Sequence, residues 1–347
     1  MLDRISTAGA MLQRDDQMQS LSSQINRITG EISSGRIADP GGQPGGAALY
    51  GLHYQADQQA VLQTSITAAG QQMDTLQTAM TSLGSAAGSL VSTASGAANT
   101  IGPSLQVVAT AAQGTLSQML GLLNTTSGGA YVFSGHDGGT APMADAAVPQ
   151  AAAQSALSAQ VTAAGGPLGA GNVAALTAAL AGYFNDSAPA GAPGFTGGTF
   201  LARDDGKPMQ VLAGSGAPVS YDAKADAPAF RDLLQGAATL SLLGAPSGQL
   251  DAGARQALLQ HGIALLQQGT QEMTTLQGQL GAAQQQLTRA ASIQQQAADA
   301  TATQIAAGEQ SDPYANSQQL SALQTQLQAT YEITVQISRM SLVNYMP

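Results

Sequence analysis

The side chains that most often carry catalysis or bind metal ions are few in this sequence and far apart. The three histidines, His53, His136 and His261, have no acidic residues around them at metal-ligand spacing. We therefore interpret them as ordinary surface or core residues. The chain has no cysteine, which excludes a thiolate metal site, a cysteine nucleophile and a disulfide scaffold. It also lacks a phosphate-binding loop, a nucleophile elbow and an HExxH motif. The sequence thus predicts no enzyme activity, no catalytic or metal site and no cofactor.

Charge and the length of the apolar runs argue against a nucleic-acid-binding protein and against a membrane protein. The chain has a net charge of −10, and only 9% of its residues are charged. Such a chain is poorly suited to bind nucleic acid, because affinity for phosphates depends on lysine and arginine. No run reaches the roughly 18 to 20 apolar residues that span a bilayer. Near the N-terminus the longest apolar run is Ala8 to Leu12, shorter than the ~7 residues or more of a secretory signal. We expect no nucleic-acid partner, no membrane anchor and no cleaved signal peptide.

Apolar residues repeat alternately every three and four residues in several parts of the chain. The first such series runs from Met11 to Ile32, and a longer one runs from Leu62 to Ala94. A third runs from Leu259 to Ala290, and the last begins at Leu320. This spacing is typical of helices that pack through a coiled-coil seam. Another helical series from Leu105 to Leu123 adds to a mainly helical prediction.

Glycine and proline interrupt the helical pattern near both ends, at Ser34–Gly46 and Gly308–Pro313. The two long series inside these breaks each need a partner, so we expect them to pair. The predicted fold class is mainly α with a smaller β-containing insert, in an elongated antiparallel helical bundle built from both terminal regions. The predicted domains are an inner layer of terminal helices (1–46 and 308–347), a helical bundle (47–136 and 226–307) and an outer domain (137–225).

The outer domain is predicted from a loss of helical spacing. Glycine, proline and alanine dominate there, and short apolar segments occur at 198–202, 208–213 and 218–223. Segments of this kind are typical of short strands separated by turns. A low-complexity linker is the alternative interpretation.

The last helix presents a problem, because no later segment of the sequence can cover its apolar side chains. A helix of this type gains stability by burying its seam. The two terminal helices can fold back onto the bundle, pair with each other or bind other copies of the chain. We favour binding to other copies, with an ordinary intramolecular bundle as the alternative. The predicted assembly-interface residues are Leu21, Ile25, Ile28, Leu323, Leu327, Tyr331, Ile333, Ile337, Met340 and Leu342.

Four stretches of the sequence resemble the bacterial flagellin superfamily. They are RIST (Arg4–Thr7), EISSGRIADP (Glu31–Pro40), GGAYVFSGHDGGTAPM (Gly128–Met143) and LQATYEITVQISRMSLVNYM (Leu327–Met346). The last, and MSLVNYM in particular, is most similar to the hook-associated proteins of that superfamily. One departure is Gly41-Gly42-Gln43-Pro44, where the superfamily commonly has an acidic pair before proline.

This resemblance implies a structural subunit of the flagellum that links the hook to the filament. It implies an extracellular location and export without a cleaved signal peptide. The implied partners are other copies of the chain in a ring, an adjoining hook-associated protein, flagellin, and an export chaperone on the C-terminal helix. A flagellin that forms the filament itself is the alternative. A secreted helical effector with a functional insert is the second alternative.

Overall fold

The computed structural model describes residues 2–42, 46–98, 103–187, 194–203, 206–214 and 218–343, with side chains described between residues 12 and 336. The chain divides into two compact units. Unit 1 comprises Met1–Val61 and Gln295–Pro347, and unit 2 comprises Leu62–Gln294. Two long helices, α2 (Gly46–Ala97) and α7 (Ala252–Glu309), contribute to both units.

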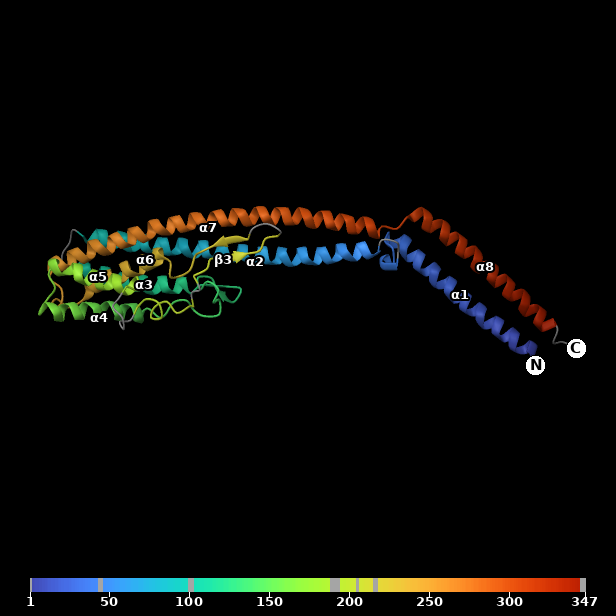
Figure 1. The fold of residues 1–347 in the computed structure, drawn as a ribbon, viewed down its shortest axis with the longest axis horizontal. Helices are drawn as coiled ribbons and strands as arrows, with labels where there is room; N and C mark the ends of the chain where they lie inside the picture. Colours follow the sequence, from blue (N-terminus) through green and yellow to red (C-terminus); the bar gives the residue numbers. More distant parts are fainter. Residues whose placement is uncertain are drawn as a thin grey trace. The chain divides into compact units, whose positions relative to one another are not determined.

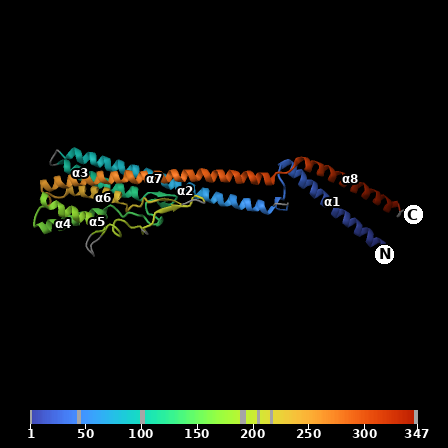
Figure 2. The same cartoon turned by 45° about the horizontal axis from the view of Figure 1, so that its top comes forward.

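Unit 1 is built around the two terminal helices, α1 (Leu2–Ser34) and α8 (Pro313–Val343). They lie side by side and run in opposite directions (Figure 1), as the turned view also shows (Figure 2). Helix α8 begins as the sequence predicts. Pro313 occupies its first position, where a missing N–H costs nothing. The Asp312 carboxylate caps the helix by accepting the backbone N–H groups of Tyr314 and Ala315, at 2.9 and 3.1 Å.

The predicted break at the N-terminal side also lies where the sequence places it. Helix α1 ends at Ser34, and Gly35 follows with a φ of +69°, the left-handed conformation that ends many helices. The backbone N–H of Gly35 donates to the carbonyl of Glu31 at 2.8 Å. After the short 3₁₀ turn η1 (Pro40–Gly42), α2 begins at Gly46.

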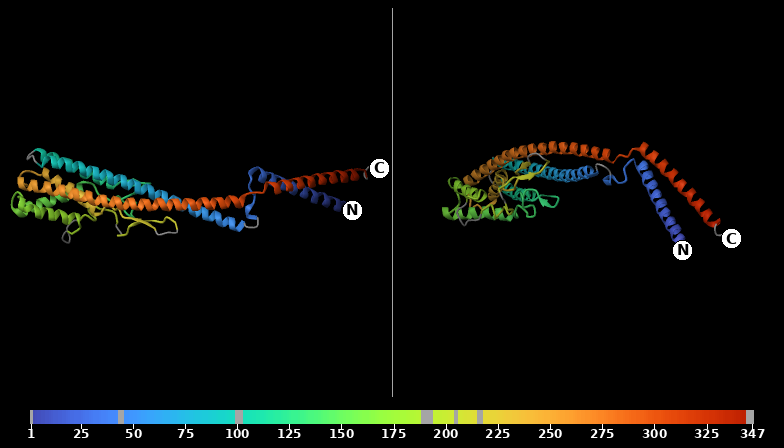
Figure 3. Two further views of the ribbon diagram at one scale, coloured as in Figure 1. Left: turned by 90° about the horizontal axis from the view of Figure 1, so that it is seen from above. Right: turned by 45° about the vertical axis from the view of Figure 1, so that its right-hand side comes forward.

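Unit 2 buries the long seams that the sequence predicts. Within it, α2 and α7 run antiparallel: Gly70 faces Leu287, the Asp74 carboxylate accepts the Gln284 amide at 3.0 Å, and Gly84 faces Met273. Two shorter helices, α3 (Pro103–Leu123) and α6 (Pro228–Ser241), pack against each other beside them (Figure 3). The buried seam residues of α2 are Ile66, Ala69, Met73, Leu76, Met80, Leu83, Ala87, Leu90 and Ala94, and those of α7 are Leu259, Leu266, Met273, Leu280, Ala283 and Leu287.

Glycines allow α6 and α7 to approach closely. A Cβ added at Gly262 would lie 2.6 Å from Cγ of Leu240, and one added at Gly269 would lie 2.9 Å from Cγ of Leu233. Both distances are shorter than non-bonded carbon atoms tolerate. The two glycines are one heptad apart on α7, so they open the same face of that helix to α6.

The region between α3 and α6 contains two helices that the sequence analysis did not identify. These are α4 (Ala147–Ala164) and α5 (Val173–Phe184), and both consist largely of alanine and other uncharged residues. Because their outer faces lack charged residues, the contrast between polar and apolar faces that reveals most surface helices is weak. The expectation of a region built mainly from strands and loops was therefore wrong for this part of the chain.

Short antiparallel strand pairs supply the β structure of the same region. Strand β3 (Met209–Val211) pairs with β4 (Val219–Tyr221), with Gln210 opposite Ser220. Both strands lie inside predicted segments. The third predicted segment forms no extended strand, although Phe200 forms isolated bridges with Met143 and Thr196. Two further strands of two residues each, β1 (Thr126–Ser127) and β2 (Ala130–Tyr131), pair in a second hairpin.

This region is folded onto α6 and shares its core. The ring of Phe133 packs edge-on against Phe230, with centroids 5.5 Å apart. The guanidinium of Arg231 lies 5.0 Å from the ring centroid of Phe195 and donates to the carboxylate of Asp186 at 3.1 Å. These contacts exclude a low-complexity linker for the described residues. The predicted fold class, a mainly helical bundle with a smaller β-containing insert, is confirmed. The division into inner, middle and outer layers stays a prediction.

Candidate assembly surface

The seam between α1 and α8 has a small buried centre among the side chains that the structure describes. Leu21 and Ile28 from α1 and Leu323 from α8 are buried together, as the spacing of these residues predicts. In the free chain the terminal helices therefore pair with each other, which is one of the three arrangements that the sequence allows. The side chains that are partly buried around this cluster are Ile25, Ile32, Leu320 and Leu327.

Beyond Leu327, the large apolar side chains of α8 that the structure describes are exposed. Tyr331, Ile333 and Val335 are 56%, 51% and 51% exposed. Thr330 and Thr334, in contrast, are partly buried and continue the row that begins at Leu320. Tyr331 and Val335 are four residues apart and lie on one face of α8, whereas Ile333 lies on another face. Exposed apolar side chains on more than one face suit a helix that contacts several neighbours in an assembly. Of the remaining predicted interface residues, Ile337, Met340 and Leu342 belong to α8, but their side chains lie outside the described part of the chain.

A set of hydrogen bonds joins the two chain breaks in unit 1. Arg36 and Gln310 form an isolated antiparallel bridge. The backbone N–H of Ile37 donates to the carbonyl of Glu309 at 2.8 Å, and that of Ser311 donates to the carbonyl of Gly35 at 3.1 Å. The breaks thus pair with each other as two short extended segments. No sequence pattern predicts this pairing, because neither segment has strand-like alternation.

Two carboxylates reinforce this pairing. Glu31 is only 5% exposed and accepts hydrogen bonds from Arg27, Asn316 and the backbone N–H of Ala38. Glu309 lies 3.5 Å from the guanidinium of Arg36 and 3.1 Å from Nε2 of His53. Glu31 was not among the predicted site residues, although the Arg27–Glu31 spacing of four residues is one that pairs charges on a helix.

Exposed tyrosines are concentrated in unit 1. All five phenylalanines of the chain are buried, and all of them lie in unit 2. The exposed tyrosines among the described residues lie in unit 1 instead. Tyrosine is enriched at protein interfaces because it offers a large apolar ring with a polar end. Unit 1 therefore has the composition of a surface that binds other proteins. Its exposed tyrosines are Tyr50, Tyr54, Tyr314 and Tyr331.

The histidines do not gather into a site. His53 contacts Glu309, whereas His261 is partly buried in unit 2 with no hydrogen-bond partner on Nε2 among the described residues. Burial lowers the pKa of His261, because the low-dielectric interior disfavours its charged form. Across the part of the chain that the structure describes, no three His, Asp or Glu side chains are placed to hold a metal ion. Nor is any described helix both long and apolar enough to cross a lipid bilayer.

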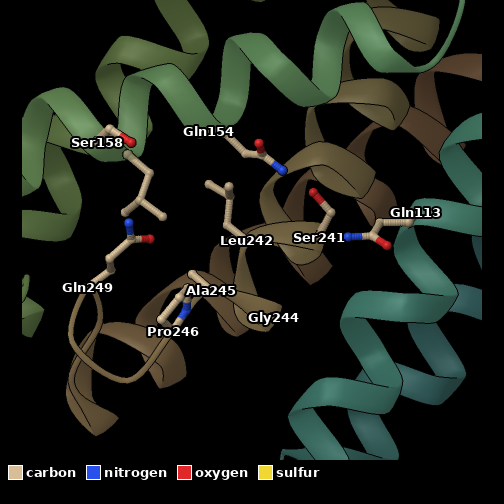
Figure 4. A pocket seen from close by; sticks show the side chains of 10 residues that line it. Gln113, Gln154, Ser158, Ser241, Leu242, Gly244, Ala245, Pro246 and Gln249 are labelled. Atoms are coloured by element: carbon tan, nitrogen blue, oxygen red, sulfur yellow. The ribbon is translucent and has the colours of Figure 1, made fainter.

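Unit 2 has a polar pocket of about 300 Å³ between α3, α4 and the end of α6 (Figure 4). The amide groups of Gln113, Gln154 and Gln249 surround it, and the Ser241 hydroxyl donates to the Ala238 carbonyl at 2.6 Å. None of its lining residues is charged or is a histidine. The pocket therefore offers hydrogen bonds but no group that exchanges protons near neutral pH. A second, apolar groove of about 860 Å³ lies between α4 and α5 and is lined mainly by alanine.

Comparison with known proteins bears on the C-terminal part of the chain. Residues 263–346 match the protein family described as the bacterial flagellin C-terminal helical region. The matched segment includes most of α7 and all of α8, and hence the exposed residues Tyr331, Ile333 and Val335. No curated protein matches the chain. The family match supports the resemblance to the flagellin superfamily and a structural role in the bacterial flagellum.

Proposed function

We propose that the chain is a structural subunit of the bacterial flagellum that joins the hook to the filament. The observation that carries this proposal is the exposed apolar end of α8, which lies inside the segment matched to the flagellin C-terminal helical region. Flagellar subunits assemble by packing copies side by side, and this end of α8 offers the apolar area that such packing buries.

The resemblance of the closing residues supports the junction in particular. MSLVNYM, at residues 340–346, is most similar to the hook-associated proteins of the superfamily. In this role the chain forms a short ring between an adjoining hook-associated protein and flagellin. It is located outside the cell, is exported without a cleaved signal peptide and is held before export by a chaperone on the C-terminal helix.

A flagellin that forms the filament itself is the second candidate, because the family match names flagellin. The two functions differ in how far the protein assembles. A junction subunit completes a short ring and stops, whereas a flagellin continues to add copies. Purified full-length protein is incubated with isolated hooks, and the assembled length is measured by electron microscopy. A short cap on each hook supports the junction, and long filaments support a flagellin.

Deletion of the gene tests the junction role inside the cell. We expect hooks of normal length that carry no filament, with flagellin released into the medium, because nothing then receives flagellin at the hook end. Expression of the full-length chain from a plasmid restores filaments in the control strain. Full filaments in the deletion strain would rule out the junction role.

A further inference from the structure

Helix α2 has a second row of large side chains in unit 1, on a different side from the one that faces α7. Leu49 and Gln59 point toward α7, where Leu49 lies beside Gly308 and the Gln59 amide donates to Thr301 at 3.2 Å. Tyr50, Tyr54 and Val61 are instead 68%, 65% and 70% exposed. Their separations of four and seven residues place these three side chains along one face of the helix.

The Tyr50 ring packs against the turn that precedes α2. A Cβ at Gly41 would lie 2.9 Å from Cζ of the Tyr50 ring, so the ring rests directly on the backbone of η1. The Gly41-Gly42 sequence, which departs from the resembled superfamily, thus has a structural consequence here. A tyrosine side chain has only two rotatable bonds, so it loses little conformational entropy on binding.

We infer that Tyr50, Tyr54 and Val61 form a lateral contact surface that binds the face of α7 carrying Arg289 and Ile293 in a second copy of the chain. This inference rests on the proposed function, which requires copies to pack side by side. It adds a contact surface separate from the exposed end of α8, and it specifies both partners in the contact.

The face of α7 at Arg289 complements the tyrosine row. Ile293 is 68% exposed and is the one large hydrophobic residue of α7 that is exposed within the described part of the chain. Arg289 lies one helical turn before it. Asp57 lies between Tyr54 and Val61 on α2, and neither Asp57 nor Arg289 forms an ion pair among the described residues.

The two faces match in chemistry and in spacing. Copies that point the same way bring α2 of one copy antiparallel to α7 of the next, because the two helices are antiparallel within each copy. In this arrangement the guanidinium of Arg289 can pair with the Asp57 carboxylate while Ile293 packs on the Tyr54 ring. Tyr54 and Asp57 are three residues apart and Arg289 and Ile293 are four, so the two pairs span about 4.5 and 6 Å of helix. Because every copy carries both faces, the contact is heterologous and can repeat until a ring closes.

Cysteine cross-linking tests the contact directly, since the natural chain has no cysteine. The double variant Tyr54→Cys with Ile293→Cys is incubated with isolated hooks and oxidised gently. We expect disulfide-linked dimers and higher species to form on assembly, because a disulfide requires Cα atoms within about 7 Å. The matched control is Tyr54→Cys with Val107→Cys, in which Val107 is an equally exposed residue of α3. Equal cross-linking of the two pairs, or none in either, would overturn the inference.

Removal of the rings gives a second readout that needs no disulfide. The variant Tyr50→Ala with Tyr54→Ala should incorporate onto hooks at least about tenfold more weakly, with unchanged monomer melting, whereas Val107→Ala should incorporate normally. If the natural chain incorporates and the tyrosine variant matches it, the inference alone is wrong. If the natural chain does not incorporate onto hooks at all, both the proposed function and the inference are wrong.

Discussion

The carboxylate of Glu31, on α1, accepts a hydrogen bond of 3.2 Å from the side-chain amide of Asn316, on α8. The same carboxylate accepts Arg27 at 2.9 Å and the backbone N–H of Ala38 at 3.1 Å. The Ser311 hydroxyl donates to the backbone carbonyl of Glu31 at 3.2 Å. One buried residue thus holds together the end of α1, the break that follows it and the start of α8.

Replacement of Glu31 should therefore loosen unit 1, because this one residue bonds three separate segments of the chain. Glu31→Ala removes the acceptor of three donors, of which Arg27 and Ala38 are exposed and can bind water instead, so the cost is about 1 to 2 kcal/mol. We expect faster hydrogen exchange across the first turns of α8 in the monomer. Glu332→Ala, at an exposed position of the same helix, is the control and should leave exchange unchanged. Equal protection in the two variants would show that Glu31 does not hold the joint.

The close approach of α6 and α7 should make Gly262 intolerant of any side chain. Gly262→Ala places a methyl group 2.6 Å from Cγ of Leu240, and such overpacking costs about 1 to 3 kcal/mol. The matched change Gly278→Ala lies on the same helix, where an added Cβ meets nothing within 4 Å. That variant should gain up to about 1 kcal/mol from helix propensity. Thermal unfolding of both variants measures the difference, and a rise in Tm for Gly262→Ala would contradict the packing.

Asp232 should make unit 2 less stable at neutral and alkaline pH. Burial, with a smaller contribution from the nearby Glu272 charge, raises the pKa of Asp232 from 3.8 to about 6. The folded chain therefore retains a proton between about pH 4 and 6 that the unfolded chain has lost. The stabilising contribution of this group is full below about pH 4 and is lost as the pH rises through about 6.

The variant Asp232→Asn removes this pH dependence, because the amide stays neutral. Two pKa units correspond to about 3 kcal/mol, so the variant should gain up to about that much relative to the natural chain between pH 4 and pH 8. Glu272→Gln should give a smaller change in the same direction. Urea unfolding at both pH values measures these differences. A difference between Asp232→Asn and the natural chain that does not change with pH would contradict the raised pKa.

The sequence predicted the parts of this fold that depend on regular repetition. The seams of α2 and α7 could be identified from their alternating spacing. Pro313 and Gly35 could be identified as breaks because proline does not fit inside a helix and glycine commonly ends one. Helices α4 and α5 escaped prediction because uncharged, alanine-rich helices show little difference between their faces. The bond between Glu31 and Asn316 escaped it because the two residues are 285 positions apart in the chain, and no local pattern encodes such a contact.

The pairing of α1 with α8 could be predicted only in part, and the role of the named residues in assembly stays a prediction. Leu21, Ile28 and Leu323 do face one another, as their heptad positions indicate. Tyr331 and Ile333 were expected on the same seam, yet Thr330 and Thr334 continue it and leave both residues exposed. The spacing of apolar residues does not show which faces of a helix are buried within the same chain and which are left exposed. The exposed tyrosines of α2 were missed for the same reason.

The exposed end of α8 as the assembly surface is the central claim, and one variant tests it most directly. Tyr331→Asp with Ile333→Asp places two charges where apolar side chains must be buried in the assembly, each worth about 1.5 to 3 kcal/mol. Thermal unfolding of the monomer and incorporation onto isolated hooks are measured on the same preparation. We predict that the melting of unit 2 is unchanged and that incorporation is lost. Normal incorporation of this variant would contradict the claim, as would a monomer whose unit 2 has unfolded.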